Sequence, residues 1–322
     1  MQSRGTDLPE LMSDTDYQLR KRRRSEALLA ACTLIWGSTF VVQKIALLSI
    51  SPLLFAAIRF SFATLILTAI FWKQIRTIDK SALQKGIALG LLLGFGFAAQ
   101  NVGLKFTTAS KSAFITGMTV VFTPLMQFII ERRPPTIGNI LGVGSVTAGL
   151  FFLTSPQGSE FNLGDGLTLV CAVLFAIYIV YLDVVSNEVS IAHLVYLQIV
   201  TTGALCLFLA LAFEPVYFVP SVGLLVSLAY LTVFATLLTT YVQTRFQRDT
   251  TPTRAAIILS LEPVIAATSA YFILGEMLGV IGVLGGALIL AGLLVSELSD
   301  GIPVLSRPLL LSEAHTNRRS SS

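Results

Sequence analysis

Residues 104–118 of this chain read LKFTTASKSAFITGM, a polar run between two long hydrophobic segments. The run contains two lysines, Lys105 and Lys111, among serines and threonines. A similar run, RFQRDTTPTRAAIIL, occupies residues 245–259. Two such interruptions in one chain indicate that the hydrophobic segments around them are two copies of one plan.

The chain is too hydrophobic for a soluble protein. Of its 322 residues, 54% are hydrophobic and 12% are charged, and the mean hydropathy is +0.79. Soluble domains carry about 25% charged residues. A helix needs about 20 mostly apolar residues to cross a hydrocarbon core ~30 Å thick. Ten segments meet this requirement, and they predict an all-α polytopic membrane protein with ten transmembrane helices. The segments are residues 27–47, 52–72, 83–103, 108–130, 137–154, 165–182, 192–213, 221–242, 254–274 and 277–296.

Basic residues gather on one side of this predicted topology. The run RKRRR at residues 20–24 precedes the first segment, and further basic residues fall in the loops at 73–80, 132–133 and 245–248. The positive-inside rule then places both termini in the cytoplasm. We expect the protein in the plasma membrane, which is the inner membrane in a bacterium. Polar residues 1–24 and 299–322 are expected to be disordered cytoplasmic tails. The adjoining helix argues against nucleic-acid binding by the basic run.

The two halves of the chain match each other weakly but along both halves, and chance matching of apolar helices is the alternative. A shift of 143 residues places Thr108 on Thr251, and the earlier helices prefer a shift of 139 residues, which places Trp36 on Phe175. The predicted repeats are residues 25–155 and 160–298, with five helices each. An odd number of helices inverts the second copy in the membrane. Inverted repeats are characteristic of secondary transporters, whose binding site lies near the midplane between the halves.

The two Thr-rich runs become equivalent turns on opposite membrane faces under this alignment. Thr108 and Lys111 open the fourth helix, and Thr251 and Arg254 open the ninth. A threonine before a helix is a favourable N-cap. Two interpretations remain open for these four residues, namely simple helix capping and gating of a transport path.

Two charged residues lie within predicted transmembrane helices. Arg59 is in the second helix and Glu262 in the ninth, at depths that bring them to similar heights in the membrane. Such charges are costly and usually face a partner or water. Three alternatives remain open: a proton-coupling carboxylate at Glu262, binding of a substrate ammonium by Glu262 and of a carboxylate by Arg59, or a fixed structural ion pair. Pro263 and Pro124 are predicted to break their helices beside a cavity.

Weaker candidates for the substrate path are Trp36 in the first helix, Gln100 in the third and Gln198 in the seventh, which occupies the repeat position of Arg59. Packing or backbone hydrogen bonding is the alternative role for each of them. The three cysteines and two histidines show no metal-ligand spacing, so no cofactor or metal site is predicted.

These residues together resemble the EamA-type drug/metabolite transporter superfamily over nearly the whole predicted membrane region. The resembling motifs are WGS at 36–38 with Lys44, AIRF at 57–60, TASKSA at 108–113, PTRAA at 252–256, LEP at 261–263, GE at 275–276 and GGALILAG at 285–292. The resemblance implies two inverted five-helix domains and alternating access, often for export of amino acids, other metabolites or drugs. It also implies a cavity lined by helices one to four and six to nine, with helices five and ten at the periphery.

The chain departs from the family pattern at several positions. Residues 131–134 read ERRP where a Gly-Glu pair is typical, Phe175-Ala176 replaces Trp-Gly, and Gln198 replaces Arg. These departures predict an asymmetric cavity.

Enzyme chemistry has little support in this sequence. There is no paired metal-ligand histidine motif, nucleophile elbow or phosphate-binding loop. The sequence therefore predicts a secondary transporter, and the family resemblance implies an exporter rather than an importer. Its expected partners are a small-molecule substrate, the lipid bilayer and, in a coupled mechanism, protons. An uncoupled uniporter or channel-like facilitator is the alternative, followed by an intramembrane enzyme. Monomer and homodimer both remain open.

Overall fold

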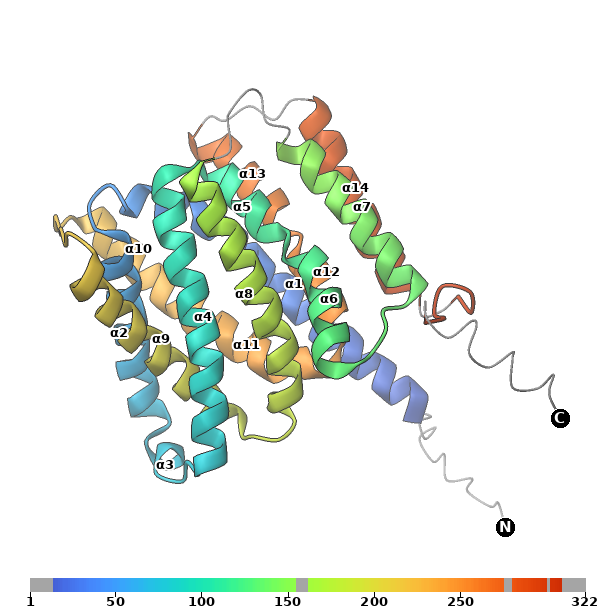
Figure 1. Ribbon diagram of the computed structural model, residues 1–322, viewed down its shortest axis with the longest axis horizontal. Coiled ribbons are helices and arrows are strands. Elements are labelled where there is room, and N and C mark those ends of the chain that lie inside the picture. Colours follow the sequence, from blue (N-terminus) through green and yellow to red (C-terminus); the bar gives the residue numbers. More distant parts are fainter. Residues whose placement is uncertain (1–13, 155–161, 275–279, 300–301, 309–322) are drawn as a thin grey trace, which may run out of the picture.

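A computed structural model describes residues 14–154, 162–274, 280–299 and 302–308 of the chain, and Figure 1 shows their arrangement. Within these ranges the regular structure is helical, apart from two isolated bridges, Ile50 with Phe218 and Thr136 with Pro308. The GE motif at residues 275–276 and the outer parts of both expected tails lie outside the described residues.

The first half of the chain contains seven helices and the second half contains nine helical elements in the described residues. The first are α1 (Asp14–Ala46), α2 (Pro52–Ile70), α3 (Trp72–Ile75), α4 (Lys80–Phe106), α5 (Ala109–Gly117), α6 (Thr119–Glu131) and α7 (Ile137–Thr154). The second are α8 (Leu163–Ser186), α9 (Ile191–Phe213), α10 (Val222–Thr232), the π-helix η1 (Val233–Leu238), α11 (Thr239–Phe246), the 3₁₀ turn η2 (Gln247–Asp249), α12 (Pro252–Leu259), α13 (Glu262–Leu274) and α14 (Val280–Leu298).

Eight helical stretches in the described residues are long and apolar enough to cross a membrane. They coincide with eight of the ten predicted segments, so the prediction of an all-helical polytopic membrane protein is confirmed. The other two segments, 137–154 and 277–296, fall on α7 and α14, which yield shorter apolar helices in the described residues. Ten membrane crossings therefore remain a prediction.

Both ends of the chain carry more structure than expected within the described residues. Helix α1 begins at Asp14, so the basic residues 20–24 lie on a helix instead of a disordered tail. At the other end, residues 302–308 form turns, and the Arg307 carbonyl accepts a hydrogen bond from the Ile137 amide. A helix with an apolar continuation costs little to extend because only its first turn must nucleate.

Two long helices are broken at equivalent positions. The first break separates α5 from α6 at Met118, and the second separates α12 from α13 at Ser260 and Leu261. A shift of 143 residues places Met118 on Leu261. Pro263 lies in the first turn of α13 directly after its break, as a residue without an N–H can. Pro124 lies inside α6 and does not mark the first break, so its predicted role there is wrong.

Small residues determine how the outermost pair of helices packs. Helices α7 and α14 lie against each other at one side of the bundle (Figure 1). A Cβ on Gly142 would lie 3.0 Å from the Gly292 carbonyl oxygen, and one on Gly149 would lie 2.6 Å from that of Gly285. Residue numbers decrease along α14 as they increase along α7, so the two helices are antiparallel. The 143-residue shift places Gly142 on Gly285 and Gly149 on Gly292, so it exchanges the two contacts.

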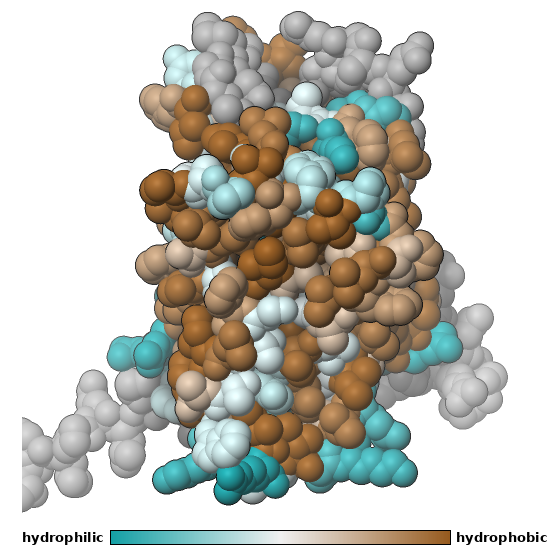
Figure 2. Space-filling view, turned by 90° about the vertical axis from the view of Figure 1, so that its left-hand side faces the viewer, coloured by the Kyte–Doolittle hydropathy of each residue, from teal (hydrophilic) through white to brown (hydrophobic). Residues whose placement is uncertain are grey.

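The surface made by α2, α9 and α10 is suited to lipid. Figure 2 shows hydrophobic residues across its middle, with hydrophilic residues gathered at the lower end. Its exposed large hydrophobic side chains include Phe62, Leu65, Leu207, Phe208, Leu211 and Leu225. Contiguous apolar surface of this kind needs a bilayer or another protein to cover it.

Candidate functional site

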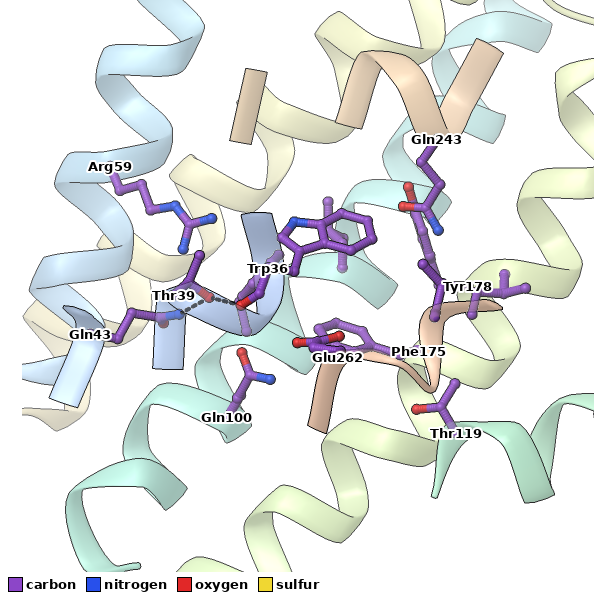
Figure 3. Close-up of a pocket in the computed structure, with 14 residues that line it drawn as sticks. Trp36, Thr39, Gln43, Arg59, Gln100, Thr119, Phe175, Tyr178, Gln243 and Glu262 are labelled. Atoms are coloured by element: carbon purple, nitrogen blue, oxygen red, sulfur yellow. Dashed lines mark hydrogen bonds between the residues drawn. The ribbon is translucent and has the colours of Figure 1, made fainter. Parts of the chain in front are cut away.

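A cavity of about 80 Å³ lies in the middle of the bundle, between the two halves of the chain (Figure 3). Helices α1, α2, α4 and α6 supply one part of its wall, and α8, α11, α12 and α13 supply the other. Its lining residues are Trp36, Thr39, Gln43, Arg59, Leu93, Phe97, Gln100, Thr119, Phe175, Tyr178, Ile179, Gln243, Leu259 and Glu262. None of them comes from α7 or α14, which lie outside the wall.

The cavity wall repeats itself across the two halves. The 139-residue shift relates Trp36 to Phe175, and it also relates Thr39 to Tyr178. The 143-residue shift relates Gln100 to Gln243, and all six of these residues line the same space. The residues that begin a helix after each break, Thr119 and Glu262, form a fourth equivalent pair. The equivalent positions of the two halves thus converge on one cavity.

Arg59 is the basic residue of the wall, and its side chain is almost wholly buried, with 1% exposed. Its Nε donates to Thr236 Oγ1 at 2.5 Å and its Nη2 to the Ala235 carbonyl at 3.0 Å. Both acceptors lie in the π-helix η1. Its guanidinium carbon also lies 5.2 Å from the ring centre of Phe97. A π-helical turn leaves carbonyls out of the regular α-helical pattern, and such turns recur at functional sites.

Glu262 is the acidic residue of the wall, and it opens α13 directly after the break at Ser260 and Leu261. Figure 3 shows its carboxylate in the space bounded by Trp36, Gln100 and Phe175. No hydrogen bond or ion pair from the described residues reaches that carboxylate, and none joins it to Arg59. The two charges share a cavity without forming the fixed ion pair that was one of the sequence-based alternatives.

The glutamines of the site differ in how their amides are satisfied. Gln43 Nε2 donates to Thr39 Oγ1 at 3.0 Å, while its Oε1 is buried without a partner in the described structure. Gln100 Nε2 reaches Thr116 Oγ1 at 3.3 Å. Gln198 does not line the cavity. It lies behind Tyr178, which donates to its Oε1 at 2.8 Å, so its predicted place on the substrate path is not what this structure shows.

The first of the two predicted turns, before α5, contacts a buried carboxylate. Lys111 Nζ lies 2.6 Å from Asp165 Oδ2, and Thr107 Oγ1 donates to Asp165 Oδ1 at 2.7 Å. Thr108 caps α5 by accepting from the Lys111 amide. Asp165 is in the first turn of α8. Thr107, Lys111 and Asp165 are called the Asp165 cluster below.

The second predicted turn, before α12, also contacts a buried carboxylate. Arg254 Nη1 lies 3.1 Å from Glu26 Oε1, and Thr250 Oγ1 donates to the same oxygen at 2.8 Å. Thr251 caps α12 by accepting from the Arg254 amide. Glu26 is in α1. Thr250, Arg254 and Glu26 are called the Glu26 cluster below.

The two clusters are equivalent by the same shifts that relate the halves. The 143-residue shift places Thr107 on Thr250 and Lys111 on Arg254, and the 139-residue shift places Glu26 on Asp165. Helices α1 and α8 start at opposite ends of the bundle (Figure 1), so the clusters lie at opposite ends too. Each joins the N-terminal half of a long helix to the turn before a broken one.

Comparison with known proteins agrees with this duplicated arrangement. The model of the EamA-like transporter family matches residues 24–155 and, a second time, residues 162–298. The chain belongs to the EamA-like transporter family. An Archaeoglobus fulgidus protein named an uncharacterized transporter is 32% identical over 282 residues, which cover 86% of this chain and 87% of that protein.

Other relatives of this EamA-like transporter carry similar names. The Bacillus subtilis protein named uncharacterized transporter YoaV is 25% identical over 287 residues, which cover 83% of this chain and 94% of that protein. A chain in a solved crystal structure has the same fold, with a TM-score of 0.71 at 16% identity over 85% of this chain and 97% of that chain. The predicted family is confirmed, and the protein is a membrane transporter.

The acidic members of both clusters in this EamA-like transporter escaped sequence reasoning. Glu26 and Asp165 lie near the ends of predicted segments, where carboxylates are ordinary, and only the 139-residue shift relates them. Gln243, Thr39 and Tyr178 also line the cavity and were not predicted as cavity residues. The described residues contain no group of three or more potential metal ligands.

Proposed function

We propose that this protein is a secondary carrier that moves a small metabolite or drug across the plasma membrane by alternating access. In this proposal ten membrane-crossing helices form two inverted five-helix repeats, and the cavity containing Arg59 and Glu262 is the substrate site. The cytoplasm holds both termini. The single observation that carries the proposal is the pair of equivalent clusters at opposite ends of one central cavity.

Each cluster is suited to act as a gate. The Asp165 cluster holds the start of α8 against the turn before α5, and the Glu26 cluster holds the N-terminal half of α1 against the turn before α12. Separating either pair exposes the cavity toward one end only. Both clusters are formed in this structure, which is the arrangement expected of an occluded intermediate between two open states.

The free-energy difference between the two open states of such a carrier follows from the equivalence of the two clusters. Opening one end loses a carboxylate–cation contact and a threonine hydrogen bond, and hydrogen bonds to charged groups contribute about 1.5–3 kcal/mol each. Closing the other end restores contacts of the same kind. The two open states therefore differ only by the inequality of the two clusters, and a ligand that binds one state better can shift their populations.

Direction and coupling are further parts of the proposal. Export is the direction that the family resemblance implies. A proton-coupled mechanism would use the Glu262 carboxylate, because it lines the cavity without a partner among the described residues. Reconstituted protein whose transport depends on an imposed pH gradient, and loses this dependence in Glu262→Gln, would establish coupling. Transport independent of the gradient would establish a facilitator.

The gating proposal is testable without knowing the substrate. The buried residues Cys32, Cys171 and Cys206 are replaced by alanine, and Leu93→Cys introduces one thiol into the cavity wall. A membrane-impermeant maleimide is then applied from either side of sealed vesicles. We expect Asp165→Asn to raise labelling from one side about tenfold or more, and Glu26→Gln to raise it from the other.

The controls separate gating from loss of structure. Glu188→Gln removes an exposed carboxylate that pairs with Lys85 away from both clusters, and it should leave labelling unchanged on both sides. If the two cluster variants increase labelling from the same side, or if neither changes it, the two clusters are not alternating gates.

A further inference from the structure

The first turns of α1 extend beyond the part of the helix that is predicted to cross the membrane. Helix α1 has 33 residues, so it is about 50 Å long, whereas about 20 residues suffice to cross the hydrocarbon core. Figure 1 shows these first turns projecting from the bundle. With the predicted crossing segment at residues 27–47, residues 14–26 lie among the lipid headgroups and in the water beyond them. The basic run at residues 20–24 belongs to this extension.

One face of the extension is bound to the rest of the protein. Lys21 Nζ lies 2.8 Å from Asp249 Oδ1, and Ser25 Oγ donates to Asp249 Oδ2 at 2.8 Å. On the same side of the helix, Arg22 Nε lies 3.7 Å from Glu26 Oε1. These contacts occupy two of the five basic residues of the run, and they fix the direction in which the rest of the helix surface faces.

The other three basic residues of the run, Arg20, Arg23 and Arg24, are exposed on the opposite face, and they are called the arginine patch below. No ion pair of theirs occurs among residues 14–154, 162–274, 280–299 and 302–308. Residues three and four apart share one face of a helix. Such steps connect five exposed residues of α1, namely Arg20, Arg24, Ala27, Ala31 and Leu34. The face of α1 that meets hydrocarbon within the membrane therefore continues into arginines beyond it.

The depth of the arginine patch matches the lipid headgroups. Arg24 lies three residues before Ala27, or about 4–5 Å beyond the hydrocarbon core, and Arg20 lies about 10 Å beyond it. The headgroup region is about 5–8 Å thick on each side of the core. Long arginine side chains adjust their heads to such an interface while their stems follow the apolar surface. Phosphate groups of lipids are thus within reach of the patch.

The second repeat has no arginines at the equivalent positions. The 139-residue shift places Arg23 on Asn162 and Arg24 on Leu163, and α8 begins at Leu163 with Asn162 as its N-cap. The repeated fold therefore does not require basic residues here. Positive charge orients a membrane protein wherever it lies in the cytoplasmic loops. Orientation accounts for the number of basic residues but not for the gathering of three of them on the lipid-facing side of one helix.

We propose that the arginine patch binds the phosphate of anionic phospholipids in the leaflet at this end of the bundle. The proposal is independent of the transport cycle proposed above. A guanidinium donates two parallel hydrogen bonds to phosphate oxygens. Anionic lipids are favoured over zwitterionic ones, because residues 14–24 contain five basic and two acidic side chains. A bound lipid holds α1 from the side opposite to its contacts with Asp249.

Lipid selectivity is measurable on the purified full chain. Delipidated protein in detergent is titrated with phosphatidylglycerol or with phosphatidylcholine of identical acyl chains, and native mass spectrometry counts the bound lipid. Glycerol phosphate, which has the anionic group without acyl chains, distinguishes a lipid site from a site for soluble phosphate. We expect phosphatidylglycerol to bind at least about tenfold more tightly than phosphatidylcholine, with a preference that decreases as salt is added, because salt screens exposed charges.

Two variants with the same change of charge locate the site. The first replaces the arginine patch and carries Arg20→Gln, Arg23→Gln and Arg24→Gln. The control replaces three exposed basic residues around α3, at the same end of the bundle, and carries Lys73→Gln, Arg76→Gln and Lys80→Gln. A basic residue near the lipid surface contributes about fivefold in affinity. The patch variant should bind phosphatidylglycerol at least about tenfold more weakly, and the control should stay within about threefold of the unaltered protein.

The comparison of lipids uses the unaltered chain, so it stands even if a variant fails to fold. Equal binding of the two phospholipids would overturn the proposal. Equal losses in the two variants would also overturn it, because they indicate diffuse attraction to the whole charged end. The same holds if glycerol phosphate competes as well as the complete lipid, or if a short DNA duplex binds the patch more tightly than phosphatidylglycerol. The labelling test of the two gates is unaffected by each of these results.

Discussion

The two ends of the molecule use the same three-residue chemistry in different surroundings. At one end Asp165 pairs with Lys111, whose side chain is 20% exposed. At the other end Glu26 pairs with Arg254, which is 4% exposed and also donates to the Ser296 carbonyl at 2.7 Å. A second buried acid, Asp249, lies beside the Glu26 cluster and contacts Lys21 at 2.8 Å.

The Asp165 cluster has a different neighbour. Lys44, near the end of α1, donates to the carbonyls of Leu104 and Thr107 at 2.6 Å. Its repeat position is Asp183. One end is therefore held by a network of side-chain ion pairs, and the other by one ion pair and a lysine bound to backbone carbonyls. The comparison teaches that equivalent clusters need not be equally strong, and it predicts that the Glu26 end is the more firmly held.

The largest expected effect is the loss of the charge at the Glu26 end. Arg254→Gln leaves the buried Glu26 carboxylate without its closest cation, and breaking a buried ion pair costs about 3–5 kcal/mol. The free energy of unfolding, measured by denaturant titration in mixed micelles, should fall by this amount. Glu26→Gln combined with Arg254→Gln should recover part of it, because no buried charge is left unpaired. A double variant that is less stable than Arg254→Gln alone would contradict this account.

The matching change at the Asp165 end should cost less. In Lys111→Gln the Asp165 carboxylate keeps its hydrogen bonds from Thr107 and the Asn162 amide. The loss is then about 1.5–3 kcal/mol, the size of a hydrogen bond to a charged group. The same titration measures it, with Lys85→Gln, in an exposed ion pair, as a control near zero. An effect equal to that of Arg254→Gln would remove the proposed difference between the ends.

A further comparison concerns the two glycine crossings of α7 with α14. Gly149→Ala should destabilise the protein by about 1–3 kcal/mol, because its Cβ would lie 2.6 Å from the Gly285 carbonyl oxygen. Gly142→Ala should cost less, because its nearest atoms are 3.0 Å away. Gly144→Ala places a methyl group where no atom lies within 4 Å, and it should not destabilise. Thermal unfolding of the three variants orders them, and destabilisation by Gly144→Ala would refute the packing explanation.

The smallest expected effect tests a loop at the Asp165 end. Tyr217 donates its hydroxyl hydrogen to the Leu47 carbonyl at 2.8 Å, and Tyr217→Phe should cost about 1 kcal/mol. Partial burial, followed by the nearby Glu214 carboxylate, raises the pKa of Tyr217 above its ordinary value of 10.0. The hydrogen bond therefore contributes fully below the pKa of the unfolded chain and is lost as the pH rises through the higher folded value. Stability differences between the two proteins, measured from neutral to alkaline pH, should decrease in that direction and not increase.

Much of the site was predictable because charge in a hydrophobic helix is conspicuous. Arg59 and Glu262 were found by their cost in a membrane, and both line the cavity. Trp36 and Gln100 also line it, whereas Gln198 is turned into a hydrogen-bonded chain behind Tyr178. Pro124 was predicted to break its helix from its residue type alone. The break instead lies before it, at Met118, which the 143-residue shift relates to Leu261 at the second break.

The sequence by itself determined that this chain forms apolar helices in two related halves, because long runs of apolar residues must leave water and a backbone in lipid must satisfy its own hydrogen bonds. It could not determine which polar side chains meet. Glu26 and Arg254 are 228 residues apart along the chain, and their contact depends on how the halves pack. Only the tertiary structure decided that Arg59 and Glu262 share one cavity without pairing, because the placement of their helices sets the distance between the two side chains.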